Sequence, residues 1–181
     1  MGKKHIAIII VLVIVAVLSS IRLISLNSKY PSPSVDRYPV NHFAPYNQFE
    51  LKITGSEFMD VNTVNEVFKE EISFGQDIKC IIVDLTVKNS GEQKKQIEIY
   101  NFILESLAWK NGINLAAFMQ INEDNDNATL APTLESGESL SLKLPFTMIN
   151  DNFKQNQWSE VENRKYSLVY NLYPTKQIID L

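Results

Sequence analysis

The first thirty residues follow a different hydrophobic pattern from the rest of the chain. Ile6 to Leu18 is an unbroken apolar run behind Lys3 and Lys4, and mostly apolar residues continue it to Leu26. As a helix, residues 6–26 would be about 31 Å long, which matches the ~30 Å hydrocarbon core of a bilayer. Apolar side chains surround this helix and leave no polar face for water. The pattern predicts a single N-terminal transmembrane helix, with the membrane as a partner of residues 6–26.

Two interpretations of residues 1–28 remain open. The basic start, apolar middle and small residues Ser19 and Ser20 also fit a cleaved secretory signal, which would release the rest as a secreted protein. We expect the uncleaved anchor instead. Because Lys3 and Lys4 favour the cytoplasmic side, the expected product is a single-pass protein of the cell membrane with an extracellular C-terminal domain.

Prolines dominate the next segment, residues 29–47. Four of them remove backbone donors and restrict φ, which disfavours a helix or a central strand. We therefore expect a semi-rigid Pro-rich stalk over residues 29–47, followed by one domain over residues 48–181.

Apolar and polar residues alternate with period two through most of residues 48–181, as in half-buried β-strands. Asn111-Gly112 is a typical hairpin turn pair. Strands with one apolar face must pack as two sheets or close into a barrel. The predicted strands cover residues 49–54, 78–89, 96–99, 102–109, 113–121, 139–146 and 166–172, with an edge strand over 177–181.

Two short helices interrupt the strands. Thr63 and Glu66 have the spacing of a capping box, which predicts a helix of one or two turns. Residues 153–162 predict a second, weaker helix.

Charge and cysteine content narrow the function classes. Residues 29–181 carry 14 basic and 21 acidic residues, a net charge of −7, which argues against nucleic acid as a partner. Cys80 is the single cysteine, so the chain has neither an intrachain disulfide nor a thiol at the end of the apolar run to carry a lipid.

Candidate chemistry is sparse. The two histidines, His5 and His42, lie at the membrane and in the expected stalk, and Cys80 lies in an aliphatic strand. No nucleophile and base are therefore paired, and we expect no enzyme, no catalytic residue and no cofactor. Asp124 and Asp126, in the acidic loop 122–127, are weak calcium candidates. A plain polar connecting loop is the other interpretation.

Trp109 and Trp158 are the candidates for a binding surface. Both lie in or near predicted loops, and large aromatic residues often anchor protein interfaces. Core packing of each tryptophan is the alternative.

Two stretches carry a family resemblance: VDLTVKNSGE at residues 83–92 and LESGESLSLKLPF at residues 134–146. In these features, residues 48–173 resemble the uncharacterised extracellular immunoglobulin-like domains of Gram-positive bacterial membrane-anchored proteins and lipoproteins. The resemblance implies an all-β fold, an antiparallel sandwich of about seven strands, and no transferable site residue. The chain departs from those proteins in lacking a lipid-bearing cysteine.

These observations lead to two functional hypotheses. The first is a membrane-tethered, extracytoplasmic, non-enzymatic module that binds a protein or a peptide. The alternative is a surface sensor or carrier that binds a small ligand or calcium through the acidic loop 122–127.

Overall fold

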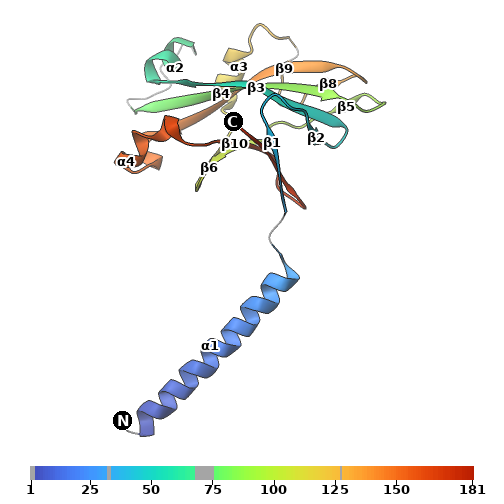
Figure 1. Ribbon diagram of the computed structural model, residues 1–181. Helices are drawn as coiled ribbons and strands as arrows, with labels where there is room; N and C mark the ends of the chain where they lie inside the picture. The colour runs from blue at the N-terminus through green and yellow to red at the C-terminus, as the bar shows by residue number, and fades with distance from the viewer. Residues whose placement is uncertain (1–2, 32–33, 68–75, 127) are drawn as a thin grey trace. The chain divides into compact units, whose positions relative to one another are not determined.

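The computed structural model describes residues 3–31, 34–67, 76–126 and 128–181 (Figure 1). It divides into two units, Met1–Ser34 and Val35–Leu181. The first unit is helix α1 (Lys3–Lys29), of which Ile8–Lys29 is long and apolar enough to cross a bilayer. The predicted N-terminal apolar helix is therefore confirmed. That it spans a membrane stays a prediction.

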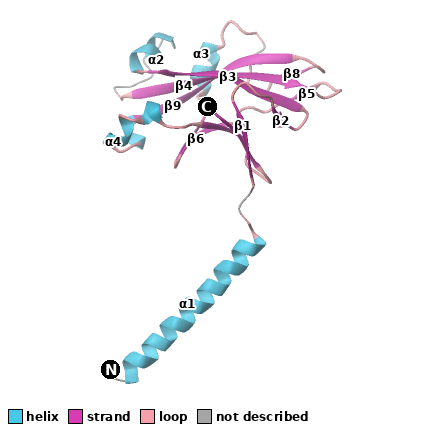
Figure 2. Ribbon diagram, viewed as in Figure 1, coloured by secondary structure: helices cyan, strands magenta, loops and turns pink. Residues whose placement is uncertain are grey.

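The second unit contains two facing sheets (Figures 1 and 2). The first sheet is antiparallel and has the order β2-β3-β4-β9. Its strands are β2 (Ala44–Tyr46), β3 (Phe49–Met59), β4 (Ile78–Asn89) and β9 (Ser139–Ile149).

The second sheet has the order β1-β11-β10-β6-β7, in which β1 and β11 are parallel and the other pairs antiparallel. Its strands are β1 (Val35–Pro39), β6 (Ile103–Ser106), β7 (Trp109–Gly112), β10 (Ser167–Asn171) and β11 (Lys176–Asp180). A separate short pair joins β5 (Lys95–Gln96) to β8 (Thr133–Leu134).

The main core lies between the two sheets. Alternate residues of β4, such as Val83 and Leu85, face Leu104 of β6 and Leu168 of β10 across it. Period-two alternation produces this arrangement because each strand buries one face.

Strand neighbours follow the immunoglobulin order. In such a sandwich strands B and E pair in one sheet, and strands C, F and G are neighbours in the other. Here β4 pairs with β9, while β6, β10 and β11 are neighbours in the second sheet. The predicted β-sandwich is confirmed. It differs from the prediction in its parallel β1–β11 pair and in short additional strands.

Among the described residues, two short helices cover the outer side of the first sheet, and three further helical turns join β9 to β10. Helix α2 and helix α3 pack on β4 through a small second core of Val64, Cys80, Ile82 and Ala117. The helices are α2 (Val61–Val67), α3 (Leu115–Ile121), α4 (Gln155–Trp158) and the 3₁₀ turns η1 (Asn150–Asn152) and η2 (Val161–Asn163).

The predicted helix after residue 60 is confirmed with a different cap. The carboxylate of Asp60, rather than Thr63, caps α2 by accepting the Thr63 backbone N–H at 2.9 Å. That hydrogen bond is the main reason why the pKa of Asp60 lies below its ordinary value. The predicted weak helix over residues 153–162 appears as α4 and the start of η2.

The strand predicted over residues 113–121 is wrong, because residues 115–121 form α3. The Asn114 side chain caps this helix by accepting the Ala117 N–H at 3.1 Å. Ala117 and Phe118 form its buried side, and Leu, Ala and Met favour helices.

The hairpin turn predicted at Asn111-Gly112 and the single strand over 102–109 are also wrong. The chain turns earlier, between β6 and β7, where Leu107 has a φ of 55°. Asn111 lies inside β7, and its amide donates to the Thr147 carbonyl at 2.7 Å. A contact with a distant strand therefore outweighs the local turn preference.

Much of the stalk predicted over residues 29–47 belongs to the sandwich. Strands β1 and β2 lie in this range, and the compact unit begins at Val35. Pro39 and Pro45 are tolerated because both strands are at sheet edges, where a missing N–H need not break the ladder.

Candidate functional site

Cys80 lies in the small core beneath α2 and α3. Burial raises the pKa of its thiol to about 12, because the charged thiolate would lose its hydration. The side chain therefore packs as a small apolar group.

The acidic loop 122–127 serves the fold through its asparagines. Asn122 is buried at the end of α3, and its amide donates to the carbonyls of Phe118 and Lys143, each at 2.9 Å. Its carbonyl accepts the Lys143 N–H, also at 2.9 Å. Asn125 donates to the Ser141 carbonyl at 3.1 Å. These side chains pair backbone groups on the outer edge of β9.

Further hydrogen bonds of this kind occupy backbone carbonyls along the outer edge of β9. The Pro145 carbonyl accepts the Asn114 backbone N–H at 2.9 Å, and Asn111 bonds Thr147 as described above. Proline itself presents no N–H at this edge. Carbonyls at four alternate positions, 141 to 147, are thus occupied, which prevents an exposed edge from recruiting another strand.

Asp124 and Asp126, the weak calcium candidates, are exposed on this loop. Asn127 lies outside the described residues. Within the described part of the chain, no group of three or more His, Cys, Asp or Glu side chains could hold a metal ion.

A hollow of about 330 Å³ lies beside the loop, on the outer face of the first sheet. Asp84 and Lys143 form an ion pair of 3.0 Å on its wall, so their charges compensate each other. Asp124 and Asn125 line its rim.

The structure brings the two candidate tryptophans together through a third ring. Phe153 lies 6.1 Å from the ring of Trp109 and 5.5 Å from the ring of Trp158, measured between centroids. All three rings are partly buried against the main core. The core-packing alternative therefore holds for part of each tryptophan, and a binding role for the exposed part stays a prediction. We call Trp109, Phe153 and Trp158 the aromatic cluster.

Tyr166 supports the aromatic cluster from the core. Its ring meets Trp109 edge to face, with centroids 6.1 Å apart, and its hydroxyl donates to the Val161 carbonyl at 2.7 Å. A tyrosine just before strand F that bonds back to the upstream backbone is the tyrosine corner of immunoglobulin-like domains. Burial raises the pKa of Tyr166 to about 12. The corner fixes the segment that carries Phe153 and Trp158.

Polar and cationic groups surround the aromatic cluster. The Arg164 guanidinium lies 5.1 Å from the Phe153 ring, and the Lys79 ammonium 5.5 Å from the Trp158 ring. The Trp158 indole N–H donates to Asp77 at 2.6 Å.

Two hollows, of about 570 and 610 Å³, share Phe153 as a wall. Trp109, Arg164 and Leu107 line the first, and Trp158 and Asp77 line the second. Residues from the β6–β7 turn, from β7 and from the segment after β9 therefore form one surface of aromatic rings flanked by hollows.

Sequence reasoning found the two tryptophans but missed Phe153, Arg164 and Leu107. Phe153 falls in the predicted weak helix, and the available signal was a second aromatic residue in the same short segment as Trp158. Leu107, 87% exposed, was hidden inside a strand predicted to continue past it.

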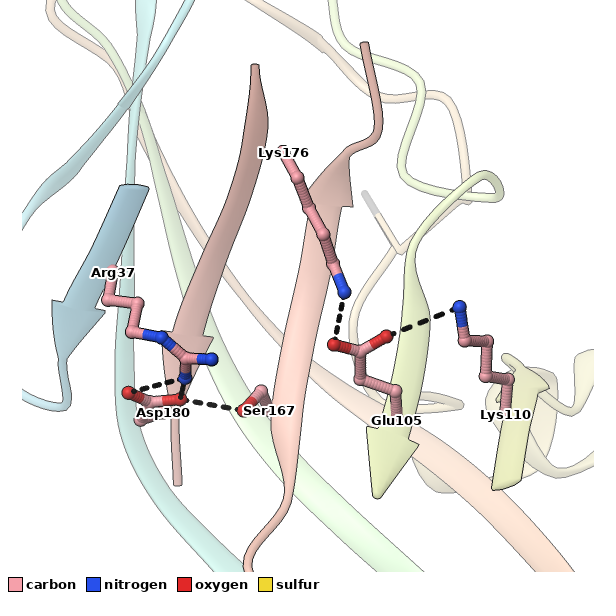
Figure 3. Close-up of polar contacts among 6 residues, drawn as sticks. All are labelled: Arg37, Glu105, Lys110, Ser167, Lys176 and Asp180. Atoms are coloured by element: carbon pink, nitrogen blue, oxygen red, sulfur yellow. Dashed lines mark hydrogen bonds and ion pairs between the residues drawn. The ribbon is translucent and has the colours of Figure 1, made fainter. Parts of the chain in front are cut away.

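The outer face of the second sheet carries compensated charges (Figure 3). Glu105 on β6 lies between Lys176 of β11 and Lys110 of β7, the latter at 3.6 Å. Asp180 pairs with Arg37 of β1 at 3.0 Å and accepts the Ser167 hydroxyl at 2.7 Å. These contacts tie neighbouring strands together, and the opposite charges among the six residues drawn compensate each other.

A family model described as a domain of unknown function (DUF5028) matches residues 36–177. The match begins inside β1 and ends inside β11, so it covers the sandwich and includes most of the segment predicted as a stalk. No curated protein matches the chain.

Several solved bacterial structures are similar to this chain at low sequence identity. A conserved hypothetical protein from Bacillus anthracis is 15% identical with a TM-score of 0.51, over 78% of this chain and 94% of that one. The yjhA protein from Bacillus subtilis is 13% identical with a TM-score of 0.49, over 80% and 98%. An uncharacterised β-sandwich protein from Clostridium difficile 630 is 10% identical with a TM-score of 0.47, over 83% and 96%. The family match and the fold shared with the Bacillus anthracis protein confirm the resemblance in its coarser part, an uncharacterised domain with a bacterial structural relative.

Proposed function

The chain belongs to the DUF5028 family, a domain of unknown function, and for this member we propose a membrane-tethered, extracytoplasmic, non-enzymatic module that binds a protein or peptide. The aromatic cluster is the binding surface. The partner is a segment that inserts apolar side chains beside Phe153 and presents acidic groups toward Arg164.

Helix α1 supports the tether. Apolar side chains cover it on all sides, and none of its apolar window is buried within the protein. A helix of this kind is stable in hydrocarbon, where its backbone groups are satisfied internally. The two lysines before it favour a cytoplasmic N-terminus and an exported sandwich.

The observation that carries the binding proposal is the aromatic cluster with its two flanking hollows. Partly exposed Trp and Arg residues are enriched among the anchors of protein interfaces. A rigid support also lowers the entropy lost on binding, and Tyr166 supplies it here.

Strand register leaves this surface accessible. Val35, the first residue after the tether, pairs with Lys176, whereas Ser167, next to Tyr166, pairs with Asp180. The aromatic cluster and the attachment point of the tether therefore lie toward opposite ends of the second sheet, and a partner can approach the cluster from the free end.

Site-specific photo-crosslinking in native membranes tests the proposal. A photoreactive amino acid replaces Leu107 on the rim of the cluster, and Ser136 serves as the exposed control. Ser136 lies in the turn before β9, and the cluster lies near the other end of that eleven-residue strand, about 30 Å away at ~3.3 Å per residue.

We expect one adduct of defined mass from position 107, none from position 136, and loss of the adduct when Trp158→Ala is added. Equal adducts from both positions, or an adduct unaffected by Trp158→Ala, would refute the assignment of the surface.

A further inference from the structure

Four exposed apolar side chains gather at the end of the second sheet where the tether joins it. Leu172 and Tyr173 lie in the turn between β10 and β11 and are 53% and 81% exposed. Val35 begins β1, and Tyr100 lies just before β6; both are about half exposed. We call Val35, Tyr100, Leu172 and Tyr173 the tether-end patch.

Strand register places these residues together. Val35 is paired with Lys176, directly after the turn that carries Leu172 and Tyr173. Val169 is paired with Ile103, and the rings of Phe102 and Tyr170 lie 6.3 Å apart, so the turn that carries Tyr100 lies at the same end of the sheet as the residues after Tyr170. The patch is therefore a property of sheet pairing and not of adjacency in the sequence.

The length of the tether limits how far this patch can lie from lipid. Helix α1 ends at Lys29 and β1 begins at Val35, so five residues separate them. From Lys29 to Val35 the backbone makes six Cα–Cα steps, which span at most about 22 Å when fully extended. If α1 spans the membrane, as the proposed function states, this link holds Val35, and with it the tether end of the second sheet, close to the membrane surface.

The chemistry of the patch suits the interface between water and lipid. Tyrosine is enriched there because its ring is apolar and its hydroxyl polar, and leucine contributes apolar area. The charges on the paired strands beside the turn are opposite in sign, Asp36 on β1 and Lys176 on β11, and Lys176 is compensated by Glu105 (Figure 3). Glu98, which accepts a hydrogen bond from Tyr100, adds one negative charge at the rim.

We propose that the Leu172–Tyr173 turn contacts the headgroup region of the bilayer, so that the sandwich rests on the membrane at this end. This inference rests on the proposed tether. The contact orients the aromatic cluster, at the opposite end of the same sheet, away from the lipid.

Depth-dependent quenching tests the contact in the full-length chain. Tyr173→Cys introduces a thiol at an exposed position. The native Cys80 is buried, so a thiol reagent labels position 173 selectively. The thiol is labelled with an environment-sensitive fluorophore, and the protein is reconstituted in phosphatidylcholine vesicles that contain a lipid spin-labelled near the headgroup. Leu107→Cys, at the aromatic cluster, is the matched control, and the unsubstituted chain measures any labelling of Cys80.

We expect strong quenching and a blue-shifted emission at position 173, neither at position 107, and no loss of quenching in high salt, because the contact is apolar. Quenching at 173 no greater than at 107 overturns the lipid contact, as does quenching that high salt abolishes. A probe at position 173 that is unquenched by the lipid, but loses its exposure to water as the protein density in the membrane rises, indicates contact with a second copy of the chain. That result also overturns the lipid contact.

Carbonate extraction of the same vesicles separates this result from the tether. A chain that stays in the membrane with an unquenched position 173 refutes the turn contact alone. A chain that carbonate releases refutes the spanning helix and removes the distance argument with it.

Discussion

Replacing Asn122 with alanine should destabilise the sandwich more than any other change in the loop 122–127. The substitution removes three side-chain hydrogen bonds, to the Phe118 carbonyl and to both backbone groups of Lys143. It also leaves the outer edge of β9 without a partner at its centre.

The magnitude follows from the number of bonds and their burial. A typical intramolecular hydrogen bond contributes about 1 kcal/mol net, and leaving a buried partner unsatisfied costs about 1–3 kcal/mol. Three bonds at a residue that is 8% exposed give a loss of about 3 kcal/mol, since some water can reach the vacated space. For a domain of this size, that loss lowers the Tm by roughly 6–12 °C.

Intrinsic fluorescence of the full-length chain in detergent measures this loss. Both tryptophans lie in the sandwich, so the signal reports its unfolding and not that of α1. Asn125→Ala, which removes the bond to Ser141, should cost about 1 kcal/mol. Asp124→Ala, on an exposed side chain, should stay within about 0.5 kcal/mol of the parent.

Amide exchange supplies a second readout. The Lys143 N–H should exchange faster in Asn122→Ala, because its acceptor is gone. If Asn122→Ala lowers the Tm no more than Asp124→Ala does, the edge contacts do not stabilise the fold and the reasoning is refuted.

Three further predictions concern Tyr166, Cys80 and calcium. Tyr166→Phe should cost about 1–1.5 kcal/mol through the lost corner bond. Burial raises the pKa of Tyr166 from 10.0 to about 12, so its contribution to the free energy of unfolding is complete below pH 10.0 and is lost as the pH rises toward 12. Across that range, the free energy of unfolding should therefore fall less steeply with pH in Tyr166→Phe than in the parent. An equal slope in the two proteins would contradict this. Cys80 should resist thiol reagents in the native protein and react fully in denaturant; rapid native labelling would show that the small core opens. Calcium should leave the Tm unchanged, both in the parent and in a double variant that carries Asp124→Asn and Asp126→Asn. A rise in the Tm of the parent that the double variant abolishes would instead support the alternative function, a sensor or carrier that binds calcium.

Sequence patterns correctly predicted the elements in which the spacing of apolar residues alone indicates which side is buried. The alternation in β4 and β9 requires one buried face, and burying several such faces at once requires a second layer. The apolar run of α1 is likewise a property of the segment itself. The two tryptophans could be named as binding candidates from residue type alone.

The misassigned segments depend on partners far away in the chain. Asn111-Gly112 has the composition of a turn, yet Asn111 lies in a strand because its amide reaches Thr147. Pro39 and Pro45 indicate a stalk until their strands are known to be edges. In each case the position of the strand within its sheet, and not the local preference of the residue, decides the structure.

The amino-acid sequence by itself determined that this protein has one long apolar helix and a set of strands that must cover each other's apolar faces. Only the tertiary structure decided that Trp109 meets Trp158 through Phe153, and that Val35, Tyr100 and Tyr173 share one end of a sheet. The physical reason is that periodicity records which side of a strand avoids water, whereas strand register determines which distant side chains become neighbours.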